Sequence, residues 1–116
     1  TIDRIIDVFP EHQQGQIRQQ LASSLEAVFS QRLVPSKSGG RACAVEILIA
    51  NAAVRNLIRE GKSFQIDNVM QTSADSGMVT MEASLMQKVQ QGLISQDVAR
   101  AYSTRPQEFD RLARNL

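Results

Sequence analysis

Apolar residues recur with a helical period at the start of the chain. The first stripe occupies positions i, i+3, i+4 and i+7, namely Ile2, Ile5, Ile6 and Phe9. Pro10 ends this helix, because proline disfavours the helical conformation of the residue before it. A second helix is predicted over about 11–28, with its stripe at Ile17, Leu21, Leu25 and Val28. The chain is therefore predicted to begin with two amphipathic helices.

The pattern then changes to that of strands. Residues 29–34 predict a first strand and 41–50 a second, in which Cys43, Val45, Ile47 and Ile49 alternate with Ala44, Glu46, Leu48 and Ala50. The loop between them is short, which favours an antiparallel hairpin. Because both faces of the second strand are largely apolar, we expect it to be covered on both sides, with Glu46 as the exception. A lone hairpin is marginal in water, so helices or a further sheet must cover it.

The stretch AVRNLIRE, residues 53–60, predicts a short amphipathic helix. Its apolar face consists of Ala53, Val54, Leu57 and Ile58, and its polar face of Arg55, Asn56, Arg59 and Glu60. Asn51 suits the N-cap, and Gly61 suits the left-handed residue that ends many helices. Arg55 and Arg59 repel each other slightly at this spacing, and no acid lies four residues away to offset them. They are predicted to point outward toward a partner. The alternative is an ordinary solvated face.

The remainder of the chain is predicted to be helical. One helix is expected over 63–71, and residues 72–77 form a loop. Thr80 is the expected N-cap of a helix that reaches Gln91, and Ser95 caps the next one. The last helix starts at 104–106 and carries the stripe Phe109, Leu112, Ala113 and Leu116. The fold class is thus mostly α with a small antiparallel β-hairpin.

Composition and charge narrow the classes of protein. A chain of 116 residues with 42% hydrophobic and 22% charged residues is typical of one small globular domain. A net charge of +1 provides no basic surface for nucleic acid, so no nucleic-acid partner is expected. The sequence shows no membrane-spanning run and no signal peptide, and a single cysteine fits a reducing compartment, so the cytoplasm is expected. Because the chain opens directly in a helix, we expect it to be a segment of something longer.

The sequence lacks the residues of an active site. Gly61-Lys62-Ser63 resembles the end of a phosphate-binding loop, but Asn56 stands where the first glycine belongs, and the motif closes a helix instead of opening one. It is better explained as a helix C-cap followed by the N-cap of the next helix. His12 and Cys43 are too few ligands for structural zinc. Asp3 and Asp7 are more typical of a solvated face than of an acid–base pair. The four methionines are more typical of core packing than of a cofactor site. We therefore predict no catalytic, cofactor or metal residues.

The motif of residues 53–60 resembles the AIRNLIRE motif of the twitching-motility retraction ATPases of type IV pili. Val54 replaces the second residue of that motif, and Asn51-Ala52 stands where the family often has Thr-Pro. The resemblance extends to TIDRIIDVFP at 1–10, RACAVEILIA at 41–50 and GLIS at 92–95. It covers the C-terminal part of such an ATPase and not the ATP-binding core.

The resemblance implies a fold and a function. Residues 1–50 would be the end of a RecA-like α/β ATPase core, and residues 51–116 a C-terminal helical subdomain. The parent would be a hexameric motor at the cytoplasmic base of the pilus, peripheral to the inner membrane, with ATP and Mg²⁺ bound upstream of this chain. Its motif helix would couple the ring to retraction, with Arg55 and Arg59 contacting a neighbouring subunit or a pilus base component. The chain alone is expected to be inactive and prone to self-association.

Two other interpretations remain open from the residues. One is the corresponding part of a pilus-assembly or type II secretion ATPase, for which zinc-binding cysteines before the C-terminal part would be typical. The other is a stand-alone helical interaction module without enzymatic activity. A phosphate-binding loop in the coding sequence upstream would distinguish the ATPases from the module.

Overall fold

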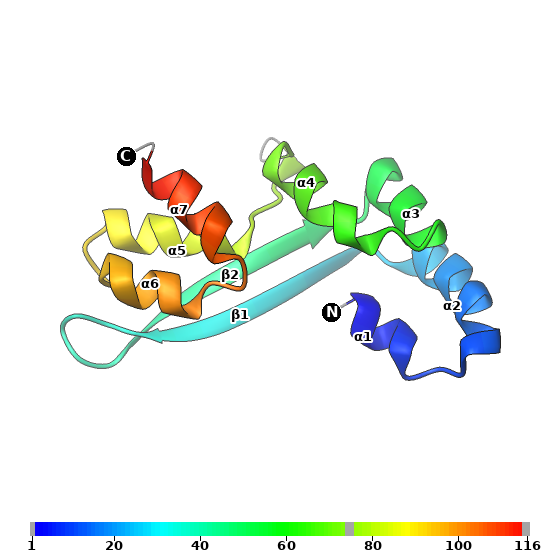
Figure 1. The fold of residues 1–116 in the computed structure, drawn as a ribbon, viewed down its shortest axis with the longest axis horizontal. Coiled ribbons are helices and arrows are strands. Elements are labelled where there is room, and N and C mark those ends of the chain that lie inside the picture. Colours follow the sequence, from blue (N-terminus) through cyan, green and yellow to red (C-terminus); the bar gives the residue numbers. More distant parts are fainter. Residues whose placement is uncertain (1, 74–75, 115–116) are drawn as a thin grey trace. The chain divides into compact units, whose positions relative to one another are not determined.

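The computed structural model describes residues 2–73 and 76–114 (Figure 1). It is mostly helical with one two-stranded antiparallel hairpin, which confirms the predicted fold class. The elements are α1 (Ile2–Asp7), α2 (Glu11–Ser24), β1 (Ala27–Pro35), β2 (Arg41–Ile49), α3 (Ala52–Arg59), the 3₁₀ turn η1 (Ser63–Gln65), α4 (Ile66–Gln71), α5 (Met81–Gln90), α6 (Gln96–Tyr102) and α7 (Pro106–Arg114).

The chain forms two compact units that alternate along the sequence. Unit 1 comprises Thr1–Val28 and Leu48–Met78, and unit 2 comprises Phe29–Ile47 and Val79–Leu116. The division predicted from the resemblance, at residues 50 and 51, concerns the domains of a longer protein and stays a prediction.

Unit 1 has an aliphatic core to which four helices contribute. Helix α2 packs against both α1 and α3, and α3 also contacts α4. The buried cluster consists of Ile2, Ile6, Ala22, Leu48, Val54, Ile58, Ile66, Met70 and Met78. None of these residues is aromatic, so the core depends on interlocking branched and flexible side chains.

Unit 2 combines most of the hairpin with the last three helices, which cluster together in Figure 1. Its buried residues are Val34, Ala44, Met81, Leu85, Met86, Ile94, Ala99 and Phe109. Thr80 and Ser95 cap α5 and α6 as predicted, since their hydroxyls accept hydrogen bonds of 3.1 Å from Ala83 N and Val98 N. All four methionines are buried in one core or the other, which confirms their predicted packing role.

The hairpin has one buried and one exposed face within unit 2. Ser36 N donates to Gly40 O at 3.1 Å and closes the turn, in which Gly39 and Gly40 have positive φ. Val34 and Ala44 are buried on one face, whereas Cys43 is exposed on the other. The prediction that β2 is covered on both sides is therefore wrong at Cys43.

The second helix is shorter than its apolar stripe predicts. It ends at Ser24, and Leu25 adopts an extended conformation while its N–H bonds to Leu21 O at 2.8 Å. Val28 belongs to β1 instead, because strand pairing satisfies its backbone and suits a β-branched side chain. Two predicted features lie outside the described residues: part of the loop at 72–77, and Leu116 of the last stripe.

Within the described parts of the chain, no helix has the length and hydropathy needed to cross a membrane.

Candidate functional site

Helix α3, which carries the AVRNLIRE motif, begins and ends as its sequence predicts. Asn51 Oδ1 accepts a hydrogen bond of 2.9 Å from Val54 N and thereby caps the first turn. Gly61 has a φ of 70°. Its N–H donates to Ile58 O at 3.2 Å, and Lys62 N donates to Leu57 O at 2.8 Å, the two bonds of a Schellman motif. Both ends of the helix are therefore fixed by local hydrogen bonds.

The buried face of α3 is narrower than predicted. Val54 and Ile58 are 0% and 1% exposed, and both belong to the core of unit 1. Leu57 is only half-buried, and Ala53 is exposed. Because successive residues are about 100° apart around a helix, Leu57 lies at one border of the buried face and Ala53 lies beyond it. The prediction that Ala53 is buried is wrong.

Arg55 lies at the opposite border of this face and contacts another helix. Its Nη1 donates to the carbonyl of Ala22 at 2.5 Å. Ala22 is in the last turn of α2, where carbonyls lack helical partners and where this helix has no basic residue of its own. A guanidinium suits that position, because the helix dipole makes the C-terminus negative. The prediction that Arg55 points outward is therefore wrong, and its role in the chain is to cap α2.

The remaining motif residues lie on the surface. Arg59 is exposed, and its Nη1 donates to Asn56 Oδ1 at 2.9 Å. Glu60 forms an exposed ion pair of 3.5 Å with Lys62. We call the exposed set the motif face: Ala53, Asn56, Arg59 and Glu60. Its one arginine is oriented by a neutral amide and can still bind an acidic group of a partner.

The prediction that residues 61–63 end one helix and cap the next is confirmed for the first helix and wrong for the second. Gly61 and Lys62 close α3, as predicted. Ser63 is not an N-cap, since the 3₁₀ turn begins at Ser63 itself and its hydroxyl donates to Asp3 Oδ1 of α1. Asp3 is therefore bonded within unit 1, which agrees with a structural and not a catalytic role.

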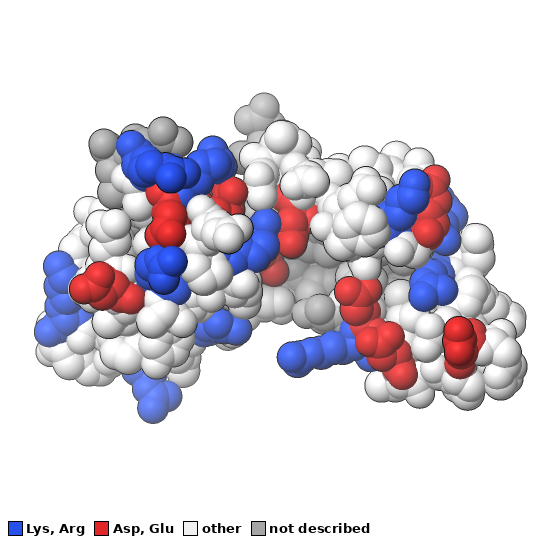
Figure 2. Space-filling view, in the orientation of Figure 1, with Lys and Arg blue, Asp and Glu red and all other residues white. Residues whose placement is uncertain are grey.

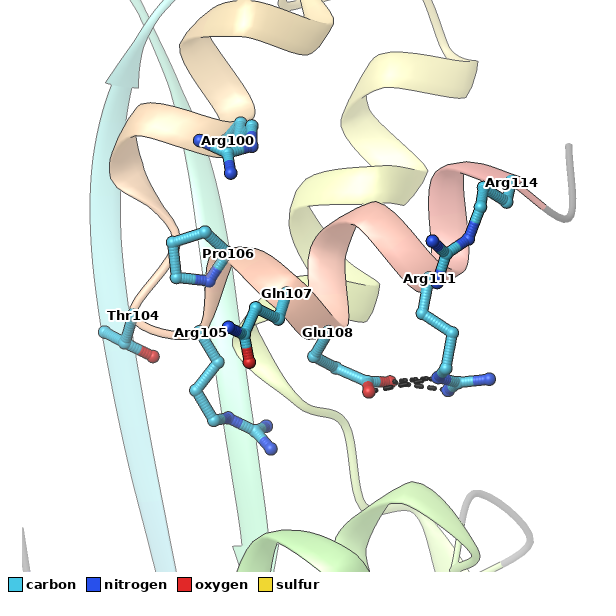
Figure 3. A pocket seen from close by; sticks show the side chains of 8 residues that line it. All are labelled: Arg100, Thr104, Arg105, Pro106, Gln107, Glu108, Arg111 and Arg114. Carbon is cyan, nitrogen blue, oxygen red and sulfur yellow. Dashed lines mark hydrogen bonds and ion pairs between the residues drawn. The ribbon is translucent and has the colours of Figure 1, made fainter.

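A second site lies at the start of α7 in unit 2 (Figure 3). A groove of about 740 Å³ is lined by Arg100, Thr104, Arg105, Pro106, Gln107, Glu108, Arg111 and Arg114. We call it the arginine groove. Glu108 accepts two bonds of 3.0 and 3.1 Å from Arg111 Nε, and Arg100 bonds to both oxygens of Asp110 at 2.9 and 3.2 Å. The sequence period of α7 predicts only its apolar stripe and gives no sign of this cluster.

These ion pairs shift the pKa values of their members. The hydrogen bond from Arg111 lowers the pKa of Glu108, and the same bond raises the pKa of Arg111. The hydrogen bond to Asp110 likewise raises the pKa of Arg100. Each of these three shifts favours the charged form of its group.

Glu82 is a buried carboxylate beside the groove. Its side chain is fully buried, and it accepts bonds from Ser103 Oγ at 2.8 Å, Thr104 Oγ1 at 3.3 Å and Arg105 Nη2 at 2.9 Å. It thereby fixes the turn that precedes α7. In the sequence Glu82 occupies the first turn of α5, where acids are common for dipole reasons alone. No local signal distinguishes it from a surface residue.

Among the residues that the structure describes, no three His, Cys, Asp or Glu side chains gather where they could bind a metal ion. The prediction that the chain contains no catalytic, cofactor or metal residue stays a prediction.

The chain is similar in sequence to two bacterial proteins of known description. It is 54% identical over 101 residues to a "Twitching motility protein" of Neisseria gonorrhoeae, a match that covers 86% of the chain and 27% of that protein. It is 43% identical over 109 residues to the "Type IV pilus retractation ATPase PilT" of Pseudomonas aeruginosa, with coverage of 94% and 32%. No protein-family model matches the chain.

A solved structure shares the fold. The pilus retraction motor PilT with bound ADP matches with a TM-score of 0.82 and 44% sequence identity, over 95% of the chain and 30% of that protein. The chain thus spans about a third or less of the length of these relatives.

Proposed function

Since the chain is related in sequence and structure to the twitching-motility retraction ATPases, we propose that it is part of an ATPase that retracts type IV pili. The observation that carries this proposal is the motif helix α3, which combines a fixed buried side with an exposed polar side. The exposed side of α3 could transmit force to a partner protein. The sequence of this chain contains no phosphate-binding loop, so ATP would bind elsewhere in the parent protein.

The motif face is the proposed coupling surface. Arg55 and the two buried residues of α3 hold the helix in unit 1, so the helix is rigidly connected to α2. Arg59 is exposed and has N–H groups for a bidentate contact with a carboxylate. A neighbouring subunit or a pilus base component is the proposed receptor. Because Arg55 is bonded to α2, the contact with a partner that the sequence predicted for both arginines is proposed for Arg59 alone.

The proposed parent is a hexameric RecA-like ring at the cytoplasmic base of the pilus, where it is peripheral to the inner membrane. Residues 1–50 would end its ATPase core, and residues 51–116 would form its helical C-terminal subdomain. ATP and Mg²⁺ would bind upstream, and the motion driven by hydrolysis would reach the pilus through α3.

The test compares single variants in the full-length protein. Arg59→Ala should abolish twitching motility while the ATPase rate and the melting temperature stay close to wild type, because the side chain is exposed and its local partner is a neutral amide. Lys62→Ala is the matched control, since it removes an exposed cation three residues away and should retain motility. Normal motility of the Arg59→Ala protein would contradict the proposed role of the motif face.

A further inference from the structure

The two compact units carry opposite net charge, although the whole chain is nearly neutral. Unit 1 contains seven acidic and five basic residues, whereas unit 2 contains five acidic and eight basic residues. This asymmetry is not visible along the sequence, because the units alternate. Surfaces of opposite sign on one chain can attract each other between copies.

The arginine groove of unit 2 is lined by four arginines and one carboxylate, Glu108. Three of these arginines pair with Asp110, Glu82 and Glu108, so four positive charges face three negative ones. Arg100 and Arg111 bond to Asp110 and Glu108 through Nε and Nη2, so among the described residues no hydrogen bond involves Nη1 of either side chain. These pairs orient the guanidinium groups before a ligand arrives, which lowers the entropy cost of binding a further anion.

A complementary surface lies on unit 1, where α1 turns into α2. Asp7 and Glu11 are both exposed, and between them Val8 is 77% exposed. We call these three residues the acidic corner. Figure 2 shows acidic side chains over α1 and the start of α2. An apolar side chain flanked by two carboxylates suits a groove that is lined by arginines and a proline.

We propose that the arginine groove of one copy of this chain binds the acidic corner of a second copy. The carboxylates of Asp7 and Glu11 pair with Arg111 and Arg114, while Val8 packs on Pro106 and the aliphatic parts of the arginines. The contact joins two different surfaces, so successive contacts either close into a ring of copies or extend into a chain of copies. This contact rests on the charges of the chain and not on the retraction activity proposed above.

The first experiment measures the mass of the chain by analytical ultracentrifugation. At about 50 mM salt, the average mass should rise with concentration above that of the monomer. At about 500 mM salt, the dissociation constant should increase at least about tenfold, because exposed ion pairs are screened. A chain that stays monomeric at low salt, or whose association does not depend on salt, overturns the proposal.

Charge reversal then identifies the two surfaces. Arg111→Glu with Arg114→Glu should abolish association, and so should Asp7→Arg with Glu11→Arg. The matched control is Lys37→Glu with Arg41→Glu, which changes the charge of unit 2 equally at exposed positions outside the groove and should retain association. Melting temperatures verify that each variant is folded.

Mixing the two charge-reversed proteins provides the decisive readout. Each has like charges on its groove and its corner. In the mixture, the native groove of one variant meets the native corner of the other, and the two reversed surfaces also complement each other. The mixture should therefore associate again, with a dissociation constant within about tenfold of the wild-type value. A mixture that remains monomeric, or a control variant that loses association, overturns the assignment of these surfaces.

Discussion

Helices α3 and α7 are of similar length, 8 and 9 residues, but different interactions fix them to their units. Helix α3 has neutral caps at both ends and an aliphatic buried face, and a long-range polar bond joins its Arg55 to a carbonyl of α2. Helix α7 buries Phe109 and follows a turn that is bonded to the buried carboxylate of Glu82. Helices this short are unstable alone, so each depends on these contacts.

The two helices differ in where their charged side chains lie. Around α3, Arg55 is bonded to α2, whereas Arg59 and Glu60 remain exposed on the motif face. Before α7, one charge is buried, and the desolvation of Glu82 must be offset by Arg105 and the hydroxyl donors of the turn. Unit 2 should therefore be the more sensitive of the two to loss of a single polar group.

The largest effect is expected at Glu82. Glu82→Ala should lower the free energy of unfolding by about 3 kcal/mol, because it leaves Arg105 and the turn without their acceptor. Glu108→Ala, which removes a carboxylate whose partner Arg111 is half-exposed, should cost less than Glu82→Ala, whose carboxylate is fully buried. Chemical denaturation of both variants measures the difference. Equal costs would show that the buried carboxylate does not stabilise unit 2.

A comparable loss is expected in the core under α3. Ile58→Ala should cost about 2–4 kcal/mol, since the side chain is fully buried in the core of unit 1. Leu57→Ala should cost clearly less, because Leu57 lies at the border of the buried face. The shift of the urea midpoint checks both values. A Leu57→Ala protein as unstable as Ile58→Ala would contradict the orientation of the helix.

The two motif arginines should differ in a way that the sequence does not show. Arg55→Ala should cost about 1–2 kcal/mol, because the last turn of α2 loses its cationic cap. Arg59→Ala should stay within about 0.5 kcal/mol. Urea titration of both variants separates these outcomes, and Arg55→Lys should recover part of the loss. Similar stabilities for the two alanine variants would show that the bond to Ala22 contributes nothing.

The smallest effect concerns pH. The pKa of Glu108 is lowered in the folded chain, so its stabilising contribution is complete above the unfolded pKa, about 4.3, and is lost as the pH falls through the lower folded value. Glu108→Gln should therefore be less stable than wild type at pH 7 and equal to it in strong acid. Melting curves across this range measure the difference, and a gap that persists below both pKa values would assign it to packing instead.

The sequence by itself determined the local structure. The glycine-rich turn of the hairpin, the caps Asn51, Thr80 and Ser95 and the left-handed Gly61 are as predicted. The helical periods located the helices, although α2 ends before its apolar stripe does. These features depend on hydrogen bonds between residues three to five positions apart, so the residues that form them are visible together in the sequence. The resemblance of residues 53–60 to the retraction-ATPase motif is likewise visible in the order of the residues alone.

Only the tertiary structure decided which charged residues are structural. Arg55 bonds to a carbonyl 33 residues away, and Glu82 bonds to Arg105 at a separation of 23 residues. The end of α2 was also set by distant pairing, since Ala50 N donates to Glu26 O at 2.9 Å just beyond the helix. Such contacts form because separate elements pack together, and no local period or propensity encodes which side chain will meet an unpaired helix end or a buried carboxylate.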